Sequence, residues 1–266
     1  MAIPFARLSF PDMYEQFLVG PLFRPWAEGV LEAVALTPAD RLLDVACGTG
    51  IVARLAKDRL GHAGTVVAVD LSPAMLAVAR RAGEGIDWRE GDAAALPLED
   101  GERFDVVVCQ QGMQFFPDRA AAARQMRRAL VPGGRLAVST WRPDEEAPVC
   151  RELRHVAEHH VGPISDRRHC FGEADPLEAL LRDAGFHEVR SRTLSRIIRF
   201  ETGAVFVRLN AMALVGMSGG SKEMDDGARE RAVAAIVRDS AGILEANTDE
   251  TGFTFQLGTN LTTARG

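Results

Sequence analysis

The chain has 266 residues, a formal net charge of -6 and a pI near 5.6; 47% of its residues are hydrophobic and 26% are charged. This composition is typical of a globular protein and excludes a largely disordered chain. Because proteins that bind nucleic acid usually carry a basic patch, the acidic balance argues against a nucleic-acid partner.

The cysteines and the start of the chain indicate the compartment. Cys47, Cys109, Cys150 and Cys170 are widely spaced and form no C-x-x-C pair, so we expect reduced thiols and not a disulfide framework. The first residues lack a basic region followed by an apolar run of signal-peptide length, and no apolar run is long enough for a membrane helix. We therefore predict a cytoplasmic protein that does not insert into a membrane.

The first half of the chain has the pattern of an α/β fold. Two helices are expected at Phe10–Leu18 and Leu22–Leu36, from apolar residues at helical spacing. From Pro38 to Trp141 short β-type runs then alternate with helical patterns, which is typical of a parallel sheet with helices on both faces. The expected strands are Arg41–Val45, Thr65–Val69, Ile86–Arg89, Phe104–Cys109 and Arg135–Thr140, and the helices between them lie near Ile51–Leu60, Pro73–Ala82 and Arg119–Leu130.

The second half adds two more strands and further helices. Helices are expected at Pro148–Val161 and Pro176–Ala184, and strands at Val189–Phe200 and Gly252–Thr263. The segment between these strands is too long for a loop and contains helical patterns at Ala204–Leu214 and near Ala228–Ala246, so we interpret it as an inserted helical cap. We expect N-terminal helices in 1–37, the ligand-binding core in 38–145, and the rest of the sheet in 146–266, with the cap at about 146–170 and 203–247.

A glycine-bearing loop follows the first expected strand. Asp44 lies in that strand, and Gly48 and Gly50 precede a helix. Glycines without Cβ atoms let a ligand approach the backbone, and the helix offers free N–H groups at its start. The loop therefore predicts a site for a nucleotide-like ligand.

Two kinds of nucleotide-like ligand fit this loop. Gly48-x-Gly50-x-x-Ala53 with Asp70 twenty residues further on satisfies a dinucleotide fingerprint, and Asp70 would accept ribose hydroxyls in either case. Asp44 separates the two, because an acid there suits a cationic sulfonium ligand better than a pyrophosphate. The acids Asp44, Asp70 and Asp92 together favour S-adenosylmethionine over a nicotinamide cofactor.

The chain resembles the class I S-adenosylmethionine-dependent methyltransferases, in the group that includes quinone-biosynthesis and natural-product methyltransferases. The resemblance covers about residues 38–142, with its motifs in the expected order. It implies a Rossmann-like fold, here with seven strands in a mostly parallel sheet whose last strand is antiparallel. The matching segments are Asp44–Gly50 for the D-x-x-x-G-x-G loop, Val69–Met75 for the acidic end of the second strand, Gly91–Ala93 with Leu96-Pro97 for the loop after the third, Phe104–Val107 for the fourth, and Leu130–Leu136 for the turn into the fifth.

The resemblance also implies roles for individual residues. Asp70 would hold the ribose hydroxyls, Asp92 would accept from the adenine amino group, and Leu71 and Ala93 would line the adenine slot. The loop from Ala46 to Gly50 would face the methionine portion. The remaining donor-site candidates are Met75 and Gly91 within the matching motifs, Gln110 and Gln111 after the fourth strand, and Tyr14 in the N-terminal helix, which in similar enzymes folds over the donor.

The acceptor site is less well defined, because methyl transfer needs mainly a close and aligned nucleophile. We expect a small, largely apolar or aromatic acceptor, with Gln114, Phe115, Trp141 and Met212 as its candidate contacts. A general base is optional, and His159 and His160 are its candidates. No metal site is expected. An NAD(P)-dependent oxidoreductase and a non-catalytic ligand-binding protein are the alternatives, and the oligomeric state stays open.

Overall fold

The computed structural model describes residues 8–266, which divide into two compact units. The first, here called the sheet unit, comprises Phe23–Trp141, Phe171–Leu194 and Thr259–Gly266. The second, the helical unit, comprises Arg142–Cys170, Ser195–Gly258 and the described residues before Phe23. The domain limits expected at residues 37 and 145 stay predictions.

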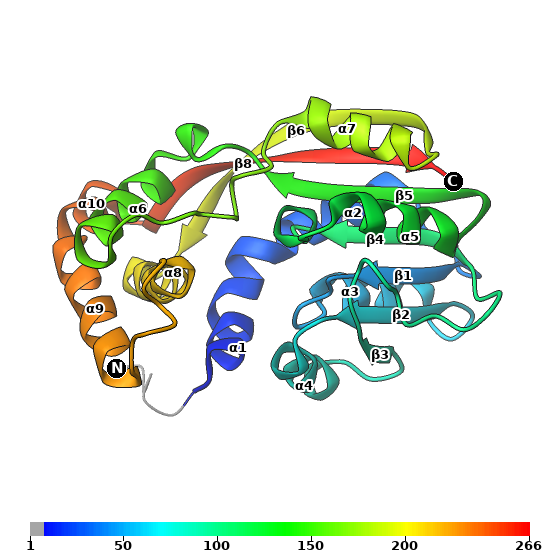
Figure 1. Ribbon diagram of the computed structural model, residues 1–266. Helices are drawn as coiled ribbons and strands as arrows, with labels where there is room; N and C mark the ends of the chain where they lie inside the picture. Colours follow the sequence, from blue (N-terminus) through cyan, green and yellow to red (C-terminus); the bar gives the residue numbers. More distant parts are fainter. Residues whose placement is uncertain (1–7) are drawn as a thin grey trace. The chain divides into compact units, whose positions relative to one another are not determined.

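The strands form one mixed sheet in the order β3-β2-β1-β4-β5-β8-β6 (Figure 1). The pairs β1–β2, β1–β4, β2–β3 and β4–β5 are parallel, and β8 runs antiparallel to β5, which confirms the predicted mostly parallel sheet with an antiparallel last strand. The strands are β1 (Arg41–Val45), β2 (Thr65–Asp70), β3 (Asp87–Glu90), β4 (Phe104–Gln110), β5 (Leu130–Trp141), β6 (His187–Phe200), β7 (Thr248–Asp249) and β8 (Gly252–Arg265).

Two strand predictions need correction. Within residues 8–266 the sheet has eight strands and not seven, because the two-residue β7 pairs with β8. So short a segment leaves no periodic pattern in the sequence. The strand expected at Arg135–Thr140 begins earlier, at Leu130. The register shifts between Phe104, which pairs with Leu130, and Val106, which pairs with Arg135, so the intervening glycine-containing segment forms a bulge within the strand.

Helices cover both faces of the sheet unit. Alternate residues of β1 point to opposite faces: Leu43 and Val45 belong to one buried cluster with α5 and α7, and Leu42 to another with α2, α3 and α4. A strand buried on both faces needs apolar side chains at successive positions, and β1 has them at Leu42, Leu43 and Val45, with Asp44 as the exception. These helices are α2 (Arg24–Val34), α3 (Ile51–Leu60), α4 (Pro73–Ala82), α5 (Arg119–Ala129) and α7 (Ala174–Asp183), and a 3-10 turn, η3, spans Met113–Phe115.

The N-terminal segment differs from its prediction. Helical conformation continues without the expected break, through α1 (Phe10–Met13), the π-helix η2 (Tyr14–Phe23) and α2. Pro21 lies inside η2. A proline lacks the N–H that an α-helix needs, and the wider π-turn is one way in which a helix absorbs that defect.

The helical unit contains η4 (Asp144–Glu146), α6 (Pro148–Val161), α8 (Gly203–Met217), α9 (Asp226–Asp239) and α10 (Ala241–Ala246). Apolar residues of α6, α8 and α9 form one core, and Phe206 packs on Phe200, Phe253 and Phe255. The helix predicted near Ala228–Ala246 is divided at Ser240, whose hydroxyl donates to the Ile236 carbonyl and competes with the helical bonds. Within residues 8–266, none of the helices has the length and apolar character to cross a membrane.

Candidate functional site

The loop after β1 has a tightly folded backbone. Ala46, Gly48 and Gly50 all have positive φ, at 59°, 57° and 87°. The Cys47 N–H donates to the Val69 carbonyl (3.0 Å), and the Gly50 N–H donates to the Cys47 carbonyl (2.8 Å). The loop thus bends back at the carboxyl ends of β1 and β2, where parallel α/β sheets bind ligands, and leads directly into α3.

The two glycines of this loop have different surroundings. A Cβ on Gly48 would meet no atom within 4 Å, so this backbone lies against open space, as an approaching ligand requires. A Cβ on Gly50 would lie 2.2 Å from Cη2 of Trp88 in β3. Packing against Trp88 therefore requires a glycine at this position, in addition to the predicted approach of a ligand, which stays a prediction.

Asp70, the last residue of β2, connects the loops around it. Its Oδ2 accepts from the Gly48 N–H (2.7 Å), and its Oδ1 accepts from the Ser72 N–H (2.8 Å). Burial raises the pKa of this carboxyl, against the lowering effect of these two hydrogen bonds. Each carboxylate oxygen has a second lone pair, so Asp70 can hold the loops and still accept from ligand hydroxyls.

Asp44 is a deeply buried acid beside the same loop. Its side chain is 1% exposed, and its Oδ2 accepts from the Ala53 N–H of α3 (3.1 Å). Burial, together with the charge of Asp70, raises its pKa to about 8, against the lowering effect of the hydrogen bond from Ala53. A buried carboxyl of this kind gains from a cationic ligand placed nearby.

The loop after β3 continues the site. The Gly91 N–H donates to the Asp70 carbonyl (3.1 Å), and Oδ1 of the exposed Asp92 accepts from the Ala94 N–H (2.9 Å). Position 91 requires a residue without a Cβ, because a Cβ there would lie 2.6 Å from Cδ of Pro97. A hydrogen bond therefore connects Asp70, at the end of β2, with the loop that carries Asp92.

Apolar residues accompany these acids. Leu71 is 68% exposed, unusual for a large apolar side chain, whereas Ala93 is 7% exposed and belongs to the core. The Met75 N–H donates to the Ser72 hydroxyl (3.3 Å), which caps the start of α4. An exposed apolar side chain of this size is a candidate contact for an apolar part of a ligand.

Buried amides follow β4. Gln111 has a positive φ of 54°; its Nε2 donates to the Thr259 hydroxyl (3.0 Å), and its Oε1 accepts from Gln114 Nε2 (3.4 Å). Thr259 donates in turn to the Thr140 carbonyl (2.8 Å). Gln110 Nε2 donates to the Phe23 carbonyl (3.1 Å). A non-glycine residue with positive φ is held by its surroundings and often marks a functional position.

The aromatic candidates of the sheet unit lie in two environments. Phe115 is 41% exposed, whereas Trp141, at the end of β5, is 6% exposed. The Trp141 ring packs against Phe23 and Trp26, with centroid distances of 6.0 and 5.7 Å. Trp141 is therefore anchored, while Phe115 is accessible.

The other predicted residues belong to the helical unit. The Tyr14 ring lies 6.3 Å from that of Phe10, and Met212 packs on the core formed by α6, α8 and α9. His159 is exposed, and His160 Nε2 lies 2.9 Å from Asp239 Oδ2 of α9. When its imidazole is protonated, His160 therefore forms an ion pair with Asp239.

Sequence reasoning missed two residues that the structure makes notable. Thr259 completes the amide chain from β4, although it lies 148 residues beyond Gln111. His169 has a buried ring whose Nδ1 lies 2.7 Å from the Arg142 carbonyl oxygen. Neither residue belongs to a motif or a periodic pattern, so no signal in the sequence singles them out. Among the described residues, no group of three or more His, Cys, Asp or Glu could hold a metal ion.

Comparison with known proteins gives the class. Residues 43–138 match a family described as a methyltransferase domain. Over 180 residues, which are 65% of this chain and 76% of the relative, the chain is 33% identical to the 2-phytyl-1,4-naphtoquinone methyltransferase of Synechococcus elongatus.

Two solved structures share the fold. A putative methyltransferase of Bacillus halodurans aligns over 90% of this chain and 97% of its own length, with a TM-score of 0.57 and 21% identity. A Haemonchus contortus phosphoethanolamine N-methyltransferase solved with S-adenosylhomocysteine aligns over 97% of this chain and 60% of its own, with a TM-score of 0.52 and 17% identity. At these identities the likeness concerns the fold alone.

The strand order and the glycine-bearing loop at the ends of β1 and β2 define a Rossmann-like fold. Together with the family match, they identify the chain as a member of the class I S-adenosylmethionine-dependent methyltransferases. Its methyl donor is S-adenosylmethionine, and the buried Asp44 and open Gly48 backbone fit a cationic donor. The nicotinamide alternative is thereby set aside.

Proposed function

We propose that this methyltransferase methylates a small aromatic acceptor of the quinol type, at a ring carbon or a hydroxyl oxygen. The observation that carries this proposal is the 33% identity to a naphtoquinone methyltransferase over 76% of that relative. The exposed Phe115 and the partly buried Met212 support it, because a largely apolar acceptor needs accessible apolar side chains. The helical cap role of α6, α8 and α9 is part of the same proposal.

Within the donor site we assign the roles that the sequence suggested. Asp70 accepts from the ribose hydroxyls through its remaining lone pairs, and Asp92 accepts from the adenine amino group. Leu71 lies against the adenine, and Asp44 provides the negative charge near the cationic part. The further proposed donor contacts are Tyr14, Ala46, Gly48, Gly50, Met75, Gly91, Ala93, Gln110 and Gln111.

Bound S-adenosylmethionine supplies a methyl group that is already activated by a positively charged sulfur. The task of the chain is then to hold the acceptor in line with that methyl group and to exclude water. The Gln111–Gln114 pair and the anchored Trp141 provide rigid polar and aromatic groups after β4 and β5. With Phe115 and Met212, these are the proposed acceptor contacts.

We also propose that the protein has no nucleic-acid partner and is cytoplasmic. The net charge of -6 supports the first statement. Cys47, Cys109 and Cys150 are buried free thiols, which agrees with a reducing compartment.

The acceptor class can be tested with a panel of chemically reduced naphthoquinols and benzoquinols, simple phenols, amines and phosphorylated metabolites. The measurement is the formation of S-adenosylhomocysteine by the full chain. We expect turnover with quinols and phenols. Turnover only with phosphorylated acceptors, or with none of the panel despite donor binding, would refute the proposed acceptor.

A further inference from the structure

Asn210 is the polar exception in an otherwise apolar part of α8. This helix contains only two residues with polar side chains, Arg208 and Asn210, and no acidic residue. The Arg208 side chain is paired, since Nη2 donates to both carboxylate oxygens of Glu230 (2.8 and 3.0 Å). Asn210, by contrast, is 5% exposed, and its Oδ1 is fully buried without a hydrogen-bond partner among residues 8–266. Asn210 thus places an unpaired amide oxygen in apolar surroundings.

An unpaired buried amide lowers the stability of a folded chain, because it loses its hydrogen bonds to water without replacing them. Two other buried polar side chains of the helical unit avoid this cost. The hydroxyls of Ser218 and Ser240 donate to the carbonyls of Val215 and Ile236, both at 2.8 Å. The Oδ1 of Asn210 has no such bond, and residues that break the rules of stability in this way are typical of functional positions. Asn210 Oδ1 is therefore able to accept a hydrogen bond from a ligand.

The neighbours of Asn210 along α8 are apolar. Residues four or seven positions apart lie on the same side of an α-helix, so Asn210 lies in one row with Phe206, Leu214 and Met217. Phe206 packs on three further phenylalanines, and Leu214 and Met217 contact the core of α6, α8 and α9. Met217 is only partly buried, so the row reaches accessible surface. All these residues belong to the helical unit.

The amide and its neighbours define the chemistry of a ligand. An amide oxygen can only accept, so the ligand must bring an O–H or N–H donor. A cationic donor is disfavoured, because α8 has no acidic residue to balance a buried positive charge, and Arg208 lies two positions away. Phenylalanine, leucine and methionine side chains suit a flat aromatic body. A neutral hydroxyl on an aromatic body meets all these requirements, whereas an ether or a carbonyl oxygen has no hydrogen to donate.

We infer that the helical unit contains a binding subsite in which Asn210 Oδ1 accepts a hydrogen bond from the hydroxyl of a neutral aromatic ligand. Phe206, Leu214 and Met217 contact the body of that ligand. Asn210 takes no part in the chemical step: it determines specificity, by favouring hydroxyl-bearing ligands over the corresponding ethers and carbonyl compounds. The identification of this ligand with the methyl acceptor rests on the proposed quinol-type acceptor, whereas the binding itself does not.

The variant that tests the subsite is Asn210→Leu, because leucine has a similar branched shape and no polar atom. Naphthol and methoxynaphthalene are the probes, and titration calorimetry of the full chain measures the affinity for each. We expect the wild type to bind naphthol about tenfold more tightly, the usual effect of pairing a group that otherwise stays unpaired. The variant should lose this preference, while its affinity for methoxynaphthalene stays within about threefold of wild type.

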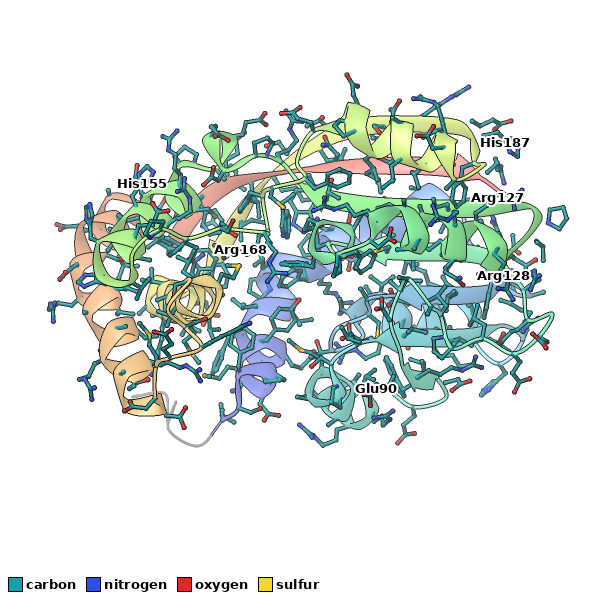
Figure 2. All side chains as sticks on the ribbon, in the orientation of Figure 1. Glu90, Arg127, Arg128, His155, Arg168 and His187 are labelled. Atoms are coloured by element: carbon teal, nitrogen blue, oxygen red, sulfur yellow. The ribbon has the colours of Figure 1, made fainter. Side chains whose placement is uncertain are left out.

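A measurement without ligand separates recognition from a structural role. Because leucine removes an unpaired amide, the melting temperature of ligand-free Asn210→Leu should equal or exceed that of wild type. Asn247→Leu is the matched control: its Nδ2 donates to the Ile243 carbonyl (2.8 Å), so this variant should melt lower and keep the preference for naphthol. His155→Gln, at an exposed position of α6 in the same unit (Figure 2), should change neither quantity.

The inference is overturned if the wild type binds neither probe or binds both equally, or if Asn210→Leu keeps the preference for naphthol. Asn210→Val, with a smaller side chain, repeats the test in case leucine is too large for the site. A melting temperature lowered in both variants would show that the fold itself satisfies the amide, and would also overturn the inference. If the preference depends on Asn210 but the chain turns over no quinol, the subsite is confirmed and the proposed acceptor is refuted.

Discussion

Asp44 and Asp70 lie at the ends of neighbouring strands, yet their carboxyl groups are held in different ways. Asp70 accepts two backbone N–H bonds that organise the loops after β1 and β2. Asp44 accepts one and is almost completely buried. An acid buried with few partners is costly in its charged form. We therefore expect the ionisation of Asp44 to affect the free energy of unfolding, and Asp70 to affect donor affinity.

The first prediction concerns the stability of the donor-free protein. The pKa of Asp44 is raised to about 8 in the folded chain, compared with about 3.9 when unfolded. Between these values the folded state binds more protons, so the free energy of unfolding falls as pH rises, and the loss is complete above pH 8. The Asp44→Asn variant has no ionisable group at this position, so it should not show this loss of stability. We expect the melting temperature of the variant, relative to wild type, to rise by about 5 °C from pH 5 to pH 9.

Calorimetric melting of both proteins across this pH range checks the prediction, and the difference between them cancels the other titrating groups. A constant difference from pH 5 to pH 9 would show that Asp44 is already ionised at low pH. Donor affinity of Asp44→Asn should be reduced throughout.

The second prediction is that Asp70→Ala weakens donor binding by about 2–4 kcal/mol, through loss of charge-assisted hydrogen bonds to the ribose. Titration calorimetry with S-adenosylhomocysteine measures this. Asp58→Ala, an exposed acid on α3, is the matched control and should bind like wild type. Because Asp70 also anchors Gly48, the far-ultraviolet circular dichroism should be compared. An affinity within threefold of wild type would remove Asp70 from the ribose site.

At the scale of elements, the loop between β1 and α3 depends on β3. The ring of Trp88 fills the space beside Gly50, and its Nε1–H donates to the Gly83 carbonyl (3.3 Å) after α4. The glycine loop is thus shaped on one side by protein and on the other by open space at Gly48. Within one motif, Gly50 is therefore constrained by packing against Trp88, whereas the backbone at Gly48 faces open space.

The different surroundings of Gly48 and Gly50 predict different losses of stability for two alanine variants. Gly50→Ala introduces a clash with Trp88 at a φ of 87°, and should lower the free energy of unfolding by about 3 kcal/mol. Gly48→Ala meets no atom within 4 Å and should cost only about 1 kcal/mol, from its positive φ, while reducing donor affinity.

Urea unfolding of the single variants and of each in a Trp88→Ala background measures the coupling. Gly50→Ala should be less destabilising without the Trp88 ring, by about 1–2 kcal/mol, whereas Gly48→Ala should be unaffected by it. Equal costs for Gly50→Ala in both backgrounds would contradict the packing explanation.

At the scale of the whole molecule, donor binding should stabilise the folded chain as a ligand that binds only the native state. At 100 times its dissociation constant, S-adenosylhomocysteine should add about 2.7 kcal/mol, or several degrees in melting temperature. NAD(H) and NADP(H) at the same concentration should have no effect, because the acids of the site disfavour a pyrophosphate. A shift with a dinucleotide and none with S-adenosylhomocysteine would contradict the donor assignment.

The sequence by itself determined the parts of this protein whose signals are local. Strand β1, the loop from Ala46 to Gly50 and the acids at the ends of β2 and β3 are recognisable because hydrophobic periodicity, glycine positions and short acidic motifs involve residues close together in the chain. The mostly parallel sheet follows from alternating strands and helices, because parallel strands need a crossover. These signals were sufficient for the fold and the methyl donor.

Only the tertiary structure decided the features that join distant residues. Gly50 is required by Trp88, Gln111 is bonded to Thr259, and the His169 ring is oriented by Arg142, over separations for which the sequence has no period or motif. The bulge in β5 and the continuous helix through Pro21 likewise override local preferences, because packing and hydrogen bonding in the folded chain outweigh the propensities of single residues.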